Sequence, residues 1–205
     1  MRSNFEILSR SADALNSKWL LALGILLLHT VVGFGVGYVG FGLGTLALGG
    51  VFSFGISRTM VLIYRGHRPQ VETYFDGFKH YLPTLVAFLL VSVIVLVGSV
   101  LLIIPGIIAA IGLSQTFYIL QDQPELGAEG AIRESWRMTW TNGHMWKVFF
   151  MHFLIFFVTL GGLLALGVGL LYTAPLGSVM AAGLYEELRL ADGQTSYDAG
   201  RVEFV

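Results

Sequence analysis

The sequence predicts an all-α, polytopic integral membrane protein whose six transmembrane helices form three hairpins, each preceded by a cytoplasmic-side amphipathic helix. All 12 basic and all 13 acidic side chains fall in four short segments, 1–18, 58–80, 122–147 and 186–205. No Asp, Glu, Lys or Arg occurs in the intervening stretches 19–57, 81–121 and 148–185. Each stretch is about twice the ~20 residues that one bilayer-spanning helix needs. Each therefore accommodates two spans and a turn.

The composition points to the same class. Apolar residues make up 55% of the chain and charged residues 12%, against roughly 25% charged in soluble domains. A very apolar soluble helical core is the alternative, and the long uncharged stretches disfavour it. We expect a single transmembrane domain, 1–205, with pseudo-repeats at roughly 1–57, 58–121 and 122–190 and a short cytoplasmic tail, 191–205.

Each charged segment before an uncharged stretch has the pattern of an amphipathic helix. Ser3 followed by Glu6 is a capping-box start for the first. In the third, Asp122 is expected to cap the helix, Pro124 to open it and Asn142-Gly143 to stop it. Gly or Pro then divides each stretch, near Gly40–Gly44, at Pro105-Gly106 and between Gly167 and Pro175. The predicted spans are 19–39, 44–64, 81–104, 106–121, 146–168 and 174–190.

The basic residues predict the orientation. In the six-span arrangement all of them fall on one side, which is expected to be cytoplasmic because Lys and Arg in short loops set topology. We therefore expect a multi-pass protein of the cell inner (cytoplasmic) membrane with both termini in the cytoplasm. Four tryptophans sit where charged and apolar segments meet and are expected to anchor the membrane interface: Trp19, Trp136, Trp140 and Trp146.

An internal repeat relates the spans. Gly55-Ile56-Ser57-Arg58-Thr59 matches Gly112-Leu113-Ser114-Gln115-Thr116, and Pro105 precedes Gly112 much as Pro175 precedes Gly183. Small residues let membrane helices approach closely, so the 26 glycines favour tight packing within one chain, with a self-association surface as the alternative. The residues expected to carry packing are Gly55, Pro105, Gly106, Gly112, Asp122, Pro124, Ser135 and Pro175.

Residues for catalysis are not evident, so no enzyme activity, cofactor or metal site is expected. The chain has no cysteine, and it lacks Walker, H-E-x-x-H and G-x-S-x-G motifs. His29 and His152 are the candidate cofactor ligands, and a hydrogen-bonded histidine in the bundle is the alternative interpretation. The net charge of −1 indicates no bulk attraction to nucleic acid.

Two stretches resemble a known family. Leu101 to Ala109 (LLIIPGIIA) and Tyr118-Ile119-Leu120 lead into Asp122 to Ala128 (DQPELGA), followed by Ala131, Ser135 and Trp136. Phe75 to Phe78 and Pro175 to Tyr185-Glu186 continue the likeness. The pattern resembles a bacterial family of six-span integral membrane proteins of unknown function, akin to the membrane domain of some glycerophosphodiester phosphodiesterases. The resemblance implies a six-helix architecture and no activity, and the phosphodiesterase catalytic domain is absent from this sequence.

These features favour a non-enzymatic membrane scaffold or accessory subunit. A carrier or channel for a lipid or other apolar solute is the main alternative, and a haem- or pigment-binding subunit is a further one. The expected partners are membrane lipids and a homo-oligomer or larger membrane complex, with no nucleic acid. We also expect the basic segment with Arg65, Arg68 and Lys79 to lie against the acidic segment around Glu186, Glu187 and Asp192.

Overall fold

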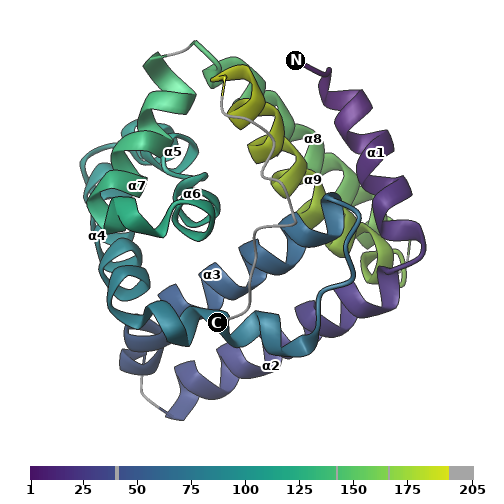
Figure 1. Ribbon diagram of the computed structural model, residues 1–205, viewed down its shortest axis with the longest axis horizontal. Coiled ribbons are helices and arrows are strands. Elements are labelled where there is room, and N and C mark those ends of the chain that lie inside the picture. Colours follow the sequence, from purple (N-terminus) through teal and green to yellow (C-terminus); the bar gives the residue numbers. More distant parts are fainter. Residues whose placement is uncertain (40–41, 142, 166, 194–205) are drawn as a thin grey trace.

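The computed structural model describes residues 1–39, 42–141, 143–165 and 167–193, and it is an all-helical bundle (Figure 1). The predicted turn residues Gly40 and Phe41, residue Asn142 and the tail from 194 onward lie outside the described residues. Figure 1 shows α4 to α7 gathered on one side of the molecule, α1 and α8 on the other, and α3 crossing between them.

The first segment forms a short helix and a helical hairpin: α1 (Asn4–Asn16), α2 (Trp19–Val39) and α3 (Leu43–Tyr64). The capping box is present, because Ser3 Oγ accepts from the Glu6 amide at 3.2 Å and Glu6 Oε2 accepts from the Ser3 amide at 2.6 Å. Gly42 precedes α3 with a φ of +87°. Glycine adopts this left-handed backbone at little cost, which allows the tight turn between the two helices.

The second segment differs from the prediction in two places. Its charged part is a 3₁₀ helix, η1 (Val71–His80), followed by α4 (Tyr81–Leu101), α5 (Ile103–Gly112) and α6 (Thr116–Asp122). The turn of the hairpin lies at Leu102, which is extended, and not at Pro105-Gly106. Pro105 instead sits in the first turn of α5, where helix amides lack partners anyway and a missing N–H costs little.

The predicted span 106–121 is two helices, because the chain leaves helical geometry between Gly112 and Thr116.

The third segment consists of η2 (Pro124–Leu126), α7 (Gly127–Trp136), the π turn η3 (Arg137–Thr141), α8 (Met145–Leu164) and α9 (Leu170–Ala191). Pro124 opens η2 and Gly143 has a φ of +72°. Asp122 does not cap α7: it is the last residue of α6. Pro175 lies inside α9, so the third turn, between α8 and α9, falls at the early end of the predicted range, near Gly167.

The core forms where α3 and α9 pack together. The second half of α3 is buried on nearly all sides, including Phe54, Met60 and Ile63, and α9 is almost continuously buried from Leu176 to Arg189. The helix α1 lies on this pair through Ile7, whose methyl group comes within 2.9 Å of a Cβ built on Gly183. Glycine at this position lets α1 and α9 approach closely.

Five helical segments are long and apolar enough to cross a membrane: Trp19–Tyr38, Leu43–Tyr64, Val71–Leu101, Ile103–Asp122 and Met145–Leu164. Large apolar side chains point outward from them, such as Phe34, Val100 and Leu164, each about three-quarters exposed. Such outward apolar faces on long helices are typical of contact with lipid. The arrangement is that of an all-α membrane protein.

Candidate functional site

Two of the repeated glycines lie at close helix contacts. A Cβ built on Gly55 would come within 1.8 Å of the Tyr74 carbonyl oxygen, so α3 and η1 meet backbone to backbone there. At Gly112 a Cβ would approach the Trp136 ring at 2.6 Å and Trp140 Nε1 at 2.8 Å. Any larger side chain would therefore force one of the neighbours away.

Ser135 fills the hydrogen-bonding gap that the break between α5 and α6 creates. Its buried hydroxyl donates to the Gly112 carbonyl at 2.8 Å and accepts from the Gln115 amide at 3.2 Å. Buried backbone groups need such partners where a helix is interrupted. The contact also sets the direction of α7: Ser135 near its end meets the start of α6, so the two helices run antiparallel.

Buried charged side chains from three helices meet where α3 and α6 end. We call Arg65, Asp122, Tyr185, Glu186 and Arg189 the ion-pair junction. Asp122 Oδ2 accepts from Arg65 Nη2 at 2.6 Å, from Arg189 Nη1 at 2.8 Å and from the Tyr185 hydroxyl at 3.0 Å. Glu186 Oε1 accepts from Arg65 Nε at 2.7 Å. The junction thus joins Arg65 of the second predicted repeat to four residues from the beginning and the end of the third.

The junction is balanced in charge and largely shielded from water. Its two guanidinium groups face two carboxylates, and the four side chains are 4–15% exposed. Burial alone would lower the pKa of Arg65, but its hydrogen bonds to Asp122 and the nearby carboxylate charges outweigh it and raise that pKa. Buried charges are tolerated only when paired in this way. The arrangement fixes the three helices relative to one another.

Further ion pairs surround the junction. Arg2 binds Glu187 at 2.6 Å, which ties the start of the chain to α9. Arg137 binds Glu134 and, at 3.0 Å, Asp192. The predicted contact between the basic and acidic segments is made by Arg65 and Glu186.

The other two basic residues of that prediction have different partners. Arg68 donates to the Ser17 carbonyl at 3.2 Å, and Lys79 pairs with Asp76 at 3.0 Å within its own segment.

The candidate histidines each have a local hydrogen-bond partner. His29 Nδ1 lies 2.9 Å from the Tyr74 hydroxyl, and His152 Nδ1 lies 2.9 Å from the Val148 carbonyl oxygen one turn earlier. The two are not brought together with acidic residues. Within the part of the chain that the structure describes, no group of three or more His, Asp or Glu side chains is arranged to hold a metal ion.

The four tryptophans divide into two kinds. Trp19 and Trp146 are exposed at the starts of α2 and α8, positions that suit an interfacial anchor. Trp136 and Trp140 stack on each other, with ring centroids 5.5 Å apart, above Gly112, and Trp136 remains exposed as well.

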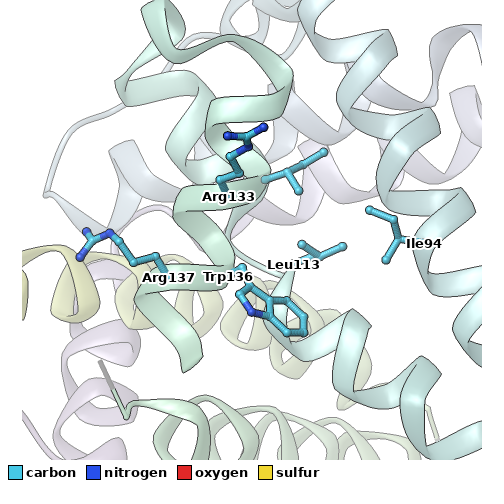
Figure 2. A pocket seen from close by; sticks show the side chains of 6 residues that line it. Ile94, Leu113, Arg133, Trp136 and Arg137 are labelled. Carbon is cyan, nitrogen blue, oxygen red and sulfur yellow. The ribbon is translucent and has the colours of Figure 1, made fainter. Parts of the chain in front are cut away.

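A groove of about 440 Å³ opens between α4 and α7 (Figure 2). Its walls are mainly apolar, and two arginine residues belong to its lining. Figure 2 shows Trp136 and Leu113 on the same side as Ile94, whereas Arg137 points away from Ile94. The lining residues are Ile94, Leu113, Ile132, Arg133, Trp136 and Arg137. The sequence alone does not reveal this groove, because its walls come from separate segments.

The fold and these contacts define a helical membrane protein held together by a buried ion-pair junction. Residues 93–192 match the model of a family described as a protein of unknown function (DUF975). The match contains Ser135, Asp122 and the α9 residues of the junction, and it agrees with the resemblance to a family of unknown function. The likeness to the membrane domain of glycerophosphodiester phosphodiesterases stays a prediction. No curated protein and no solved structure matches the chain.

Proposed function

We propose that the chain is a non-enzymatic membrane scaffold or accessory subunit with six transmembrane helices in three hairpins. Its place is the bacterial inner membrane, with both termini in the cytoplasm. The five apolar helices support five of the crossings. For the sixth we propose α9, whose charged residues lie in its second half and are buried among partners, so that its first half is free of charge.

The observation that carries the scaffold proposal is the ion-pair junction. It joins α3, α6 and α9 at one end of the bundle, and the Arg2–Glu187 pair adds the start of the chain. Buried, mutually paired charges resist rearrangement because separating one from its partner costs several kcal/mol. The charged end is therefore a fixed surface, which suits a protein whose role is to hold a partner in position.

Site-specific photocrosslinking in intact cells tests this role. Photoreactive residues at Asn16, Glu72 and Glu125, which are exposed near the charged segments, should each join one or a few defined proteins. The control is Val100, an exposed apolar position on α4, which should react with lipid only. Crosslinks to no protein from any of these three exposed positions would contradict the scaffold role.

The groove between α4 and α7 favours a second candidate, a carrier or channel for a lipid or other apolar solute, because its apolar walls suit such a solute. Flux measurements on purified protein in liposomes separate the two functions. A scaffold gives no solute-specific flux. Flux that disappears when Ile94→Trp fills the groove would establish the carrier instead.

A further inference from the structure

One face of α7 carries both the groove and a pair of opposite charges. Ile132, Arg133 and Trp136 line the groove. Glu129 lies one turn before Arg133, and residues four apart on a helix are neighbours on its surface. The face therefore runs from a charged part at Glu129 and Arg133 to an apolar part at Trp136.

The pair is available to a ligand. Arg133 Nη2 lies 3.7 Å from Glu129 Oε2, which is beyond hydrogen-bond distance, and the side chains are 83% and 77% exposed. Arg137, the other arginine of the groove, already has partners within the protein. Its hydrogen bonds to Glu134 are the main cause of its raised pKa, and it also donates to Asp192. Arg133 is thus the guanidinium of the groove that is positioned to bind an external anion.

The charged part of the face lies on the side of the molecule expected for a lipid headgroup. The end of α7 lies at the break between α5 and α6, because Ser135 contacts Gly112 there. The start of α7 follows the end of α6, where Asp122 belongs to the ion-pair junction. Trp136 packs on Gly112 at this break, so the apolar part of the face adjoins the hairpin of α4 and α5. Ile94 of α4 continues the apolar wall.

We propose that this groove binds a zwitterionic phospholipid with a primary ammonium headgroup. The Arg133 guanidinium holds the phosphodiester, the Glu129 carboxylate holds the ammonium group, and one acyl chain lies along Trp136, Leu113 and Ile94. Basic pockets beside membrane helices are known to bind phospholipid headgroups. A further acidic side chain just before α7, Glu125 in η2, favours a headgroup without net charge over an anionic one.

The site rests on the membrane placement proposed above, but holds for a scaffold and a carrier alike. Its test uses full-length protein purified in detergent, stripped of lipid and reloaded with one lipid at a time. The three lipids are phosphatidylethanolamine, phosphatidylglycerol and diacylglycerol with the same acyl chains, and native mass spectrometry counts the bound molecules. The variants are Arg133→Gln, Glu129→Gln and the groove-filling Ile94→Trp, with Arg68→Gln as the matched control at another exposed arginine.

Wild-type protein and Arg68→Gln should retain one phosphatidylethanolamine, in preference to the other two lipids. Arg133→Gln should weaken its binding about fivefold, the factor expected for one basic residue near a headgroup. Glu129→Gln should remove the preference over phosphatidylglycerol, and Ile94→Trp should abolish binding. The site would be overturned if the wild type retained diacylglycerol or phosphatidylglycerol as well as it retains phosphatidylethanolamine. It would also be overturned if Arg133→Gln and Arg68→Gln weakened phosphatidylethanolamine binding equally. Release of the protein from membranes by alkaline carbonate would instead overturn the membrane placement.

Discussion

At the scale of single residues, the structure separates glycines that are needed for packing from glycines that are not. A Cβ on Gly55 would collide with the Tyr74 backbone, whereas a Cβ on Gly33 would meet nothing within 4 Å. Gly55→Ala should lower the free energy of unfolding by about 1–3 kcal/mol because helix and η1 must move apart. Gly33→Ala is the control and should be neutral or slightly stabilising, since alanine is the better helix former. Thermal unfolding in detergent measures both, and equal stability of the two variants would contradict the close contact.

Asp122 is the residue on which the ion-pair junction depends most. Asp122→Asn keeps the shape but removes the charge that faces Arg65 and Arg189, which leaves two buried guanidinium groups with one carboxylate. We expect a loss of about 3–5 kcal/mol in the free energy of unfolding, as for other buried pairs that lose one partner. Glu125→Gln, at an exposed position three residues later, should change stability little. An Asp122→Asn protein as stable as Glu125→Gln would show that water reaches the junction.

At the scale of elements, α7 depends on a single hydroxyl for its register against α6. Ser135→Ala leaves the Gly112 carbonyl and the Gln115 amide without their side-chain partner, and an unsatisfied buried polar group costs about 1–3 kcal/mol. Hydrogen exchange should therefore become faster around the break between α5 and α6. Ser99→Ala is the matched control, because the exposed Ser99 hydroxyl donates to the Val95 carbonyl within its own helix. Unchanged exchange near Gln115 in Ser135→Ala would contradict this role.

The end of α7 should also loosen in acid. The hydrogen bonds from Arg137 lower the pKa of Glu134 below its ordinary 4.5. A carboxyl group with a lowered pKa stabilises the fold above its ordinary pKa, and this contribution disappears as the pH falls through its folded value. The pair is partly exposed, so the contribution is about 0–1 kcal/mol. The stability difference between the wild type and Glu134→Gln should therefore shrink as the pH falls below the ordinary pKa of about 4.5, as measured by melting in detergent. A constant difference would contradict the pairing.

The elements show what the sequence could and could not predict. The capping box of α1 needs only Ser3 and Glu6, which are local, and both hydrogen bonds are present. The break after Gly112 was missed because Leu113-Ser114-Gln115 has no feature that excludes a helix, and its buried partner, Ser135, comes from α7. The role of Asp122 was missed for a similar reason. Next to Pro124 it resembles a helix cap, and only the packing of α3 and α9 shows the three donors that surround it.

At the scale of the whole molecule, the six-span topology is open to single-cysteine labelling, which is direct because the chain has no cysteine of its own. Cysteines at Leu43, Leu102 and Val168, all exposed turns or helix ends, should react from the outer side. Cysteines at Gln70, Glu125 and Gln194 should react only after the membrane is permeabilised. Labelling of the Gln194 variant from outside would show that α9 does not cross, and outside labelling at Gln70 would reverse the orientation.

The ion-pair junction also has a consequence for the order in which the chain is assembled. Domains are generally completed from the N-terminal end during synthesis, so Arg65 and Asp122 emerge from the ribosome long before Glu186 and Arg189. Until α9 arrives, the first two residues lack the partners that Tyr185, Glu186 and Arg189 provide, and Arg2 has no Glu187 to bind. Insertion of α9 is therefore the step that completes the ion pairs at the charged end of the bundle. A nascent chain halted before α9 would expose that end to the quality-control proteases of the cell.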